Sequence, residues 1–172
     1  MADEMVVIAN AWPTPPGPTK EALNRAFGTF KYQEMAKGNI RIIDDWERNS
    51  IVTVQVKVRG PKKKRSVQLH HAIVPMFVDL MAVVYESFPH YAIDQLGGYC
   101  PRHKMHDPER GLSIHSWGVA VDINWRNNPV SRKLITDFPE GFPEIFEGAG
   151  WSWGGRWRKT KDSMHFQYTD GA

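Results

Sequence analysis

The sequence predicts an α+β protein in which a small antiparallel sheet is flanked by helices, and three patterns support this fold class. Residues 119–124 alternate apolar and polar side chains, as a half-buried strand does. Residues 164–168 alternate in the same way. Apolar residues spaced three and four apart over 72–88 predict a helix that packs on a core and ends before Pro89. A chain of 172 residues can bury one such core, so we expect a single domain over residues 1–172.

The remaining elements follow from shorter patterns. Prolines exclude a helix from much of residues 5–18, so we expect an extended arm there. Thr19 suits the N-cap of a helix that reaches about Lys37. Alternating valines predict a strand over residues 51–58. In the second half we expect short helices over residues 129–137 and 139–148, and a tryptophan-rich segment over residues 150–157.

Composition and charge describe an ordinary globular protein. Hydrophobic residues make up 41% of the chain and charged residues 24%. Cys100 is the single cysteine, which excludes an intramolecular disulfide and favours a reducing compartment at synthesis. Apolar runs are too short for a membrane span, and Asp3 and Glu4 do not fit a signal peptide, so we expect synthesis in the cytoplasm without membrane insertion. The net charge of +3 suits anionic wall polymers or nucleic acid and does not distinguish them.

Half of a metal site is encoded between Ser113 and Asp122. His115 and Asp122 are seven residues apart, a spacing that would place them on opposite faces of one unbroken strand. A bend at Gly118 removes this obstacle. Ala120 shares the face of Asp122, and its small side chain leaves room for an ion and a substrate. The segment therefore predicts one imidazole and one carboxylate ligand.

The third ligand and a general base are expected near the C-terminus. A catalytic zinc site takes three protein ligands and leaves a position for water. His165 is the best candidate, because Met164, Phe166 and Tyr168 form the apolar face of a strand and leave His165 on the other. Asp162 lies just before this strand, where a carboxylate could act as a base without being a ligand.

These residues resemble the zinc D-alanyl-D-alanine carboxypeptidases and dipeptidases and the L-alanyl-D-glutamate endopeptidases of phage endolysins. The family motif Ser-x-His-x-x-Gly-x-Ala-x-Asp is matched from Ser113 to Asp122. A second motif, an acidic residue three places before a histidine, is matched at Asp162 and His165 and follows a Gly-Trp-x-Trp-Gly-Gly-x-Trp run. The resemblance covers about residues 97–168, which it identifies as the catalytic core, and it implies a hedgehog/DD-peptidase-like fold.

The resemblance implies Zn²⁺ held by His115, Asp122 and His165, with Asp162 as the catalytic base. Arg102, in the run Tyr99-x-x-Arg102, resembles an arginine that approaches the substrate's carbonyl or carboxylate. The implied activity is hydrolysis of a peptidoglycan stem peptide. We expect the protein to be a monomer. Aspartate at the base position resembles the phage endopeptidases, whereas the carboxypeptidases usually carry glutamate. We therefore expect cleavage of the L-alanyl-D-glutamate bond by an endolysin that waits in the cytoplasm and reaches the cell wall after release.

Three other functions stay open. A D-alanyl-D-alanine carboxypeptidase would use the same residues at a free C-terminus. A non-catalytic wall-binding protein could keep zinc as a structural element, although Asp162 argues against it. Nucleic-acid binding would depend on the basic run Lys62 to Arg65, for which a solvated turn or an envelope contact are the other interpretations, and we expect no nucleic-acid partner.

Several side chains are weaker candidates for the same chemistry. Cys100, His103 and His106 have a spacing that could bind zinc, but no periodic element holds them on one face, so a substrate-facing loop is the preferred interpretation. The other candidates have no partner motif, and we expect structural or solvated roles for them: His70, His71, Glu144 and Glu147.

Overall fold

A computed structural model describes residues 12–171, so the N-terminal half of the expected extended arm lies outside the described residues. The segment 12–18 contains no helix or strand. None of the described helices has the length and apolar character needed to cross a bilayer.

The α-helices are α1 (Lys20–Phe27), α2 (Trp46–Ser50), α3 (Val74–Ser87) and α4 (Phe142–Gly148). The strands are β1 (Tyr32–Glu34), β2 (Ile40–Ile42), β3 (Ile51–Lys57), β4 (Lys64–His70), β5 (Leu96–Gly97), β6 (Ala120–Ile123), β7 (Val130–Ser131), β8 (Ser152–Trp153), β9 (Lys161–Asp162) and β10 (His165–Gln167).

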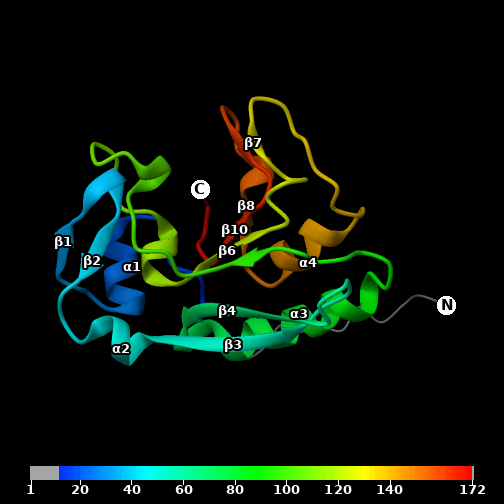
Figure 1. The fold of residues 1–172 in the computed structure, drawn as a ribbon, viewed down its shortest axis with the longest axis horizontal. Helices are drawn as coiled ribbons and strands as arrows, with labels where there is room; N and C mark the ends of the chain where they lie inside the picture. Colours follow the sequence, from blue (N-terminus) through cyan, green and yellow to red (C-terminus); the bar gives the residue numbers. More distant parts are fainter. Residues whose placement is uncertain (1–11, 172) are drawn as a thin grey trace.

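The long hairpin β3–β4 and helix α3 form the base of the molecule (Figure 1). The predicted strand over residues 51–58 and the helix over 72–88 are both present, with slightly shorter bounds. Helix α3 packs against β3 through the apolar stripe that the sequence indicates. Two parts rise from this base: one carries α1, β1 and β2, and the other carries α4 and β7 to β9 (Figure 1).

A four-stranded antiparallel sheet, in the order β5-β6-β10-β8, crosses the middle of the fold. In its register His165 on β10 lies directly opposite Asp122 on β6, and Phe166 lies opposite Val121. Because opposed residues of an antiparallel pair project from the same face, one face of the sheet carries His165 and Asp122 together. The other face carries Val121 and Phe166, both fully buried. The expected small antiparallel sheet with flanking helices is thus present.

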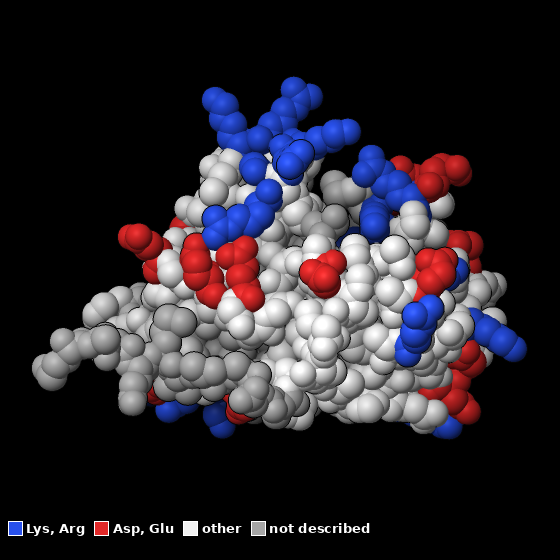
Figure 2. All heavy atoms as spheres, turned by 180° about the vertical axis from the view of Figure 1, so that it is seen from behind, with Lys and Arg blue, Asp and Glu red and all other residues white. Residues whose placement is uncertain are grey.

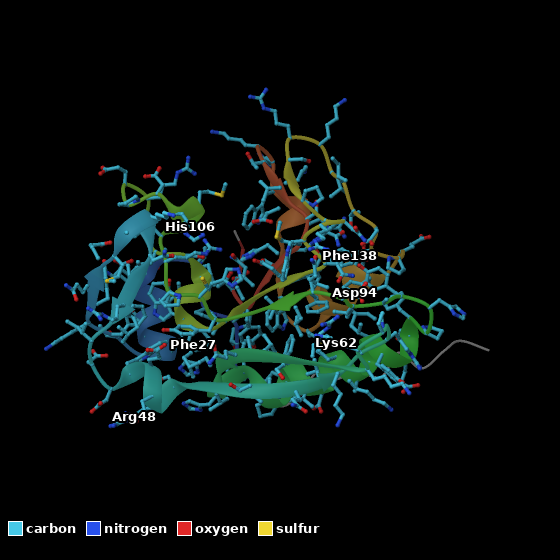
Figure 3. The ribbon with its side chains drawn as sticks, in the orientation of Figure 1. Phe27, Arg48, Lys62, Asp94, His106 and Phe138 are labelled. Carbon is cyan, nitrogen blue, oxygen red and sulfur yellow. The ribbon has the colours of Figure 1, made fainter. Side chains whose placement is uncertain are left out.

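An aromatic cluster fills the space behind this sheet. Phe166 packs against Phe142 and Phe146 of α4, and Phe138 stacks on Phe142 with ring centres 4.5 Å apart. Figure 3 shows Phe138 inside this part of the molecule, close to α4. The predicted helix over residues 139–148 corresponds to α4, and its inward-facing phenylalanines make the sheet a rigid support for whatever its opposite face holds.

The expected helix from Thr19 to about Lys37 is wrong in its length. Thr19 is the N-cap, as expected, but α1 ends at Phe27. Gly28 has a φ of 90°, and a Cβ atom there would lie 2.8 Å from Nε1 of Trp46. That indole nitrogen donates a hydrogen bond to the carbonyl of Phe27, so a tertiary contact ends the helix where the local pattern would continue it.

The expected helix over residues 129–137 is absent. The backbone of β7 pairs there with β9, and the following loop is closed by Asn128, whose Oδ1 accepts hydrogen bonds from the backbone of Asp137 and the hydroxyl of Thr136. Strand β4 is not among the strands that the sequence predicts, because the basic run Lys62 to Arg65 is typical of a solvated turn. In the structure Lys64 and Arg65 begin β4 and pair with Lys57 and Val56 of β3.

His70, at the end of β4, is buried in an apolar part of the core. Its ring lies 5.2 Å from that of Phe27, and its Nε2 lies 3.1 Å from the Phe27 carbonyl. Its Nδ1 accepts a hydrogen bond from the backbone of Ala72. Burial, followed by the neighbouring His71, lowers the pKa of His70 to about 4. The expected structural role of His70 therefore has a physical basis: the folded state requires the neutral ring.

We predict that this histidine makes the protein sensitive to acid. The folded state resists protonation of His70 down to a pKa of about 4, whereas the unfolded chain takes up the proton near 6.5. Stability from the neutral ring is therefore fully present above pH 6.5 and falls as the pH drops toward 4, by up to about 3 kcal/mol. Urea unfolding measured between pH 7.5 and 4 should show this fall in the free energy of unfolding. His70→Gln should make the free energy of unfolding less dependent on pH, while substitution of the exposed His90 by glutamine should not. An equal pH dependence in the two variants would contradict the assignment.

Candidate metal centre and substrate cleft

Three side chains from three separate elements converge on one point. His115 lies on a 3-10 helix, Ile114–Trp117, which ends at Gly118 in a left-handed conformation with φ of 70°. This is the bend that the sequence predicts, and it turns the chain into β6, which carries Asp122. Nε2 of His115 lies 3.2 Å from Nδ1 of His165 and 3.2 Å from Oδ2 of Asp122. Nδ1 of His165 lies 3.0 Å from Oδ1 of Asp122.

Hydrogen bonds on the far sides of both rings fix which nitrogens face this point. Nδ1 of His115 lies 2.7 Å from the carbonyl oxygen of Gly98, an acceptor, so it carries the proton. Gln167 donates its amide N–H groups to Thr169 and Gly171, and its oxygen lies 3.0 Å from Nε2 of His165. That nitrogen therefore carries the proton as well. Each ring presents a bare lone pair to the centre, beside the carboxylate of Asp122.

Two lone pairs and a carboxylate cannot satisfy one another by hydrogen bonding, but a cation satisfies all three. Tetrahedral zinc with bonds of about 2.0 to 2.2 Å separates its ligand atoms by roughly 3.3 Å, close to the separations of 3.0 to 3.2 Å between these atoms. Within residues 12–171, His115, Asp122 and His165 form the group of possible metal ligands that converges. The donor set therefore fits a zinc ion with three protein ligands and an open position.

The electrostatics of the cluster favour a positive charge at its centre. Burial alone would raise the pKa of Asp122, but His115 and His165 hold it far below its ordinary value. Burial would lower the pKa of His165, but hydrogen bonding and charge attraction from Asp122 raise it. Both shifts show that the site is stabilised by a positive charge, which either a proton or a metal ion can provide.

Asp162 lies beside the cluster without joining it. It ends β9, opposite Val130 of β7, and it lines the same cleft as His115 and His165. Its Oδ1 is buried and has no hydrogen-bond partner among the described residues. Burial raises the pKa of Asp162, while the charge of His165 lowers it and that of Asp122 raises it. A carboxylate with a raised pKa and a free oxygen is suited to accept a proton.

A glycine allows β9 to approach the sheet. A Cβ atom on Gly154 would lie 2.4 Å from the carbonyl oxygen of Asp162 and 3.0 Å from its Cβ, both closer than van der Waals contact. Gly154 begins the 3-10 helix that follows Trp153 in the tryptophan-rich segment. The absence of a side chain at Gly154 therefore lets the chain that carries Asp162 lie against the sheet that carries His165.

Two pockets meet at the metal centre. The larger, of about 1110 Å³, is lined by His115, Asp162 and His165, and by the tryptophans at 151, 153 and 157. The smaller, of about 460 Å³, is lined by His115 and Asp122. Arg102 lines both pockets, and its charge lowers the pKa of Asp162. The structure thus brings all five sequence-predicted site residues to one cleft.

The weaker candidates do not converge. His103 is held by Glu34, with Nε2 3.0 Å from Oε2, and by the carbonyl of Arg110. His106 lies on the exposed loop next to β1 and β2 (Figure 3), and neither it nor Cys100 forms a metal-binding group with His103 among the described residues. Glu144 and Glu147 both pair with Arg156 at the surface.

The sequence prediction missed the part played by Gln167. The alternation of residues 164–168 places Gln167 on the same face as His165, and this pattern is the sequence signal that could have indicated its role. The hydrogen bond between the Gln167 amide and the His165 imidazole follows only from the fold. The smaller pocket also contains residues that the sequence did not indicate as pocket-lining, among them Trp125, Pro129 and Met164.

Residues 106–168 match the family model described as D-alanyl-D-alanine carboxypeptidase. This match confirms the resemblance to that family. The matched segment contains His115, Asp122, Asp162 and His165. The match supports the prediction of a zinc-dependent metallopeptidase that acts on peptidoglycan. No curated protein and no solved structure matches the chain.

We predict that Gln167 sets the affinity of the metal centre. Gln167→Met removes the acceptor that orients His165, and loss of such a partner costs about 10 to 100-fold in metal affinity. Competition with a chromophoric chelator measures the zinc dissociation constant, and circular dichroism checks the fold. Gln68→Met, at an exposed glutamine of β4, is the matched control and should bind zinc as the parent does. Unchanged affinity in Gln167→Met would remove this residue from the site.

Proposed function

We propose that this protein is a zinc-dependent, endolysin-type endopeptidase that hydrolyses a stem-peptide bond of peptidoglycan, namely the L-alanyl-D-glutamate bond. One observation carries the proposal: two imidazole lone pairs and the Asp122 carboxylate converge at the floor of a cleft, with a partnerless carboxylate oxygen of Asp162 beside them. This arrangement supplies a metal site and a proton acceptor to the same substrate.

In the proposed mechanism His115, Asp122 and His165 would hold a zinc ion. Zinc bound there would supply a Lewis acid that polarises a peptide carbonyl and makes water acidic near neutral pH. Gly98 and Gln167 fix the two rings so that their lone pairs stay directed at the centre. The aromatic core behind β10 keeps the three ligands in place during the reaction.

Asp162 handles the proton. It takes a proton from the attacking water as the water oxygen bonds to the carbonyl carbon, and it returns that proton to the peptide nitrogen as the C–N bond breaks. The products are a carboxylic acid and an amine. The raised pKa of Asp162 serves both steps, because the group must accept a proton and release it again.

Arg102 stabilises charge in the substrate. Arg102 lines both pockets, which supports a role in which its guanidinium donates to a carbonyl oxygen that gains negative charge or to a substrate carboxylate. A non-catalytic wall-binding protein would need neither this arginine nor the partnerless oxygen of Asp162, and we therefore favour the enzyme.

The presence of two pockets at the metal centre supports an endopeptidase over a D-alanyl-D-alanine carboxypeptidase. The pockets share Arg102, His115 and Val130 but otherwise have different linings, which gives separate space for substrate beyond each side of the bond that is cut. A carboxypeptidase needs room on the leaving side for only one residue. We further propose a hedgehog/DD-peptidase-like fold, a single zinc peptidase domain over residues 1–172, and release to the cell wall in the manner of a phage lysin.

We predict that Asp162→Asn lowers kcat by about 10² to 10⁴-fold, because the amide cannot accept the proton. It should retain one zinc ion per chain by elemental analysis, because Asp162 is not a ligand. Asp122→Ala is the contrasting variant, since it removes a ligand and should lose the metal. Wall-peptide cleavage by Asp162→Asn at close to the parent rate, or stoichiometric zinc in Asp122→Ala, would contradict the assigned roles.

We predict that digestion of purified sacculi releases whole stem peptides that begin with D-glutamate. Mass spectrometry of the soluble products distinguishes the two enzymes, because a carboxypeptidase would release D-alanine alone. Chelation of zinc should stop the reaction, and added zinc should restore it. Release of D-alanine without stem peptides would replace the endopeptidase with the carboxypeptidase.

A further inference from the structure

The larger pocket contains more basic side chains than its acidic residues can neutralise. Arg110 pairs with Asp107, and Arg156 pairs with two glutamates. Lys104, Arg158 and Lys159 have no ion-pair partner among residues 12–171. The six basic residues that line this pocket are Arg102, Lys104, Arg110, Arg156, Arg158 and Lys159, and the two acidic ones are Glu147 and Asp162. The pocket therefore has an unbalanced positive charge.

The smaller pocket has a different character. Arg102 is its single basic residue, and the rest of its lining is mainly apolar or aromatic, including Tyr99, Trp125, Pro129 and Met164. The two halves of the cleft meet at His115 and differ in charge. A substrate that lies across the metal centre would therefore be bound with its anionic part in the larger pocket.

A stem peptide has this asymmetry about the L-alanyl-D-glutamate bond. On the acyl side L-alanine is joined through an amide to the glycan and carries no charge. On the amine side D-glutamate bears an α-carboxylate, and the peptide beyond it ends in a further carboxylate. When these carboxylates are amidated, the amine side loses its negative charge.

We propose that Arg158 and Lys159 form a carboxylate-binding subsite for the amine side of the stem peptide, which makes free, unamidated stem peptides the preferred substrates. The inference rests on the proposed function and adds a direction to it: the larger pocket receives the leaving peptide and the smaller pocket the acyl side. Both residues lie on the loop that leads into β9, three and four residues before Asp162. Arg158, Lys159 and Asp162 also line the same pocket. One short segment would therefore bind the carboxylate of the leaving peptide and protonate its nitrogen.

The surface charge agrees with this placement. Figure 2 shows a dense group of basic side chains at the end of the molecule that carries β7 and β9, with no acidic side chain within the group in this view. A hollow separates it from a second, mixed group of charges. Because Arg158 and Lys159 are exposed, the attraction should be weakened by salt and should act mainly on substrate binding.

Two synthetic peptides test the subsite: one with every carboxylate on the amine side free, and one with each converted to an amide. For the zinc-loaded parent protein at low salt, kcat/KM should be roughly tenfold higher for the free peptide, mainly through KM, as expected for charge-assisted hydrogen bonds. In the double variant Arg158→Gln/Lys159→Gln the preference for the free peptide should shrink to less than about twofold.

The matched control is Arg132→Gln/Lys133→Gln. It removes the same charge from the adjacent loop after β7, but neither residue lines the cleft, so it should keep the tenfold preference. Calorimetry on Asp162→Asn gives a second readout, because it measures the affinity for both uncleaved peptides directly. The free peptide should bind that variant about tenfold more tightly.

Several outcomes would overturn the subsite. Equal cleavage and equal affinity for the two peptides would overturn it while leaving the proposed endopeptidase intact. Equal loss of preference in the test and control variants would also overturn it, because the effect would then come from net charge. Absence of cleavage of both peptides and of sacculi would overturn the proposed function, and this inference with it.

Discussion

The site depends on the register between β6 and β10. Direct opposition of Asp122 and His165 sets a carboxylate and an imidazole on one face at hydrogen-bond distance. A shift of one residue would send His165 to the aromatic core and Phe166 to the metal centre. The burial of Val121 and Phe166 on the opposite face is what prevents this shift, so the hydrophobic core selects the arrangement of the ligands.

The candidate ligands are also directed by groups that would not touch a bound metal ion. His115 depends on a backbone carbonyl of Gly98, and His165 depends on the side chain of Gln167, which is itself held by Thr169 and Gly171. These outer contacts come from positions as far apart in the chain as Gly98 and Gly171. The geometry of the site therefore depends on more residues than the three that would bind an ion.

The cleft has a polarity that follows from the same geometry. One half is cationic and borders Asp162, and the other is largely apolar and borders Asp122. In a hydrolytic reaction the group that returns a proton to the leaving amine belongs on the amine side of the bond. The position of Asp162 and the excess of basic side chains therefore point to the same orientation of the substrate, although they are independent observations.

The sequence by itself indicated the three candidate ligands, the bend at Gly118 and the acidic residue before His165, because short motifs with strict alternation fix which side chains share a face. It also predicted β3, α3 and α4, whose apolar periodicity is long or strong. The end of α1 at Gly28, the β7–β9 pairing, the role of Gln167 and the charge difference between the two pockets were decided only by the tertiary structure. Each of these arises from contacts between residues distant in the chain, such as Trp46 with Phe27, and local patterns contain no information about such contacts.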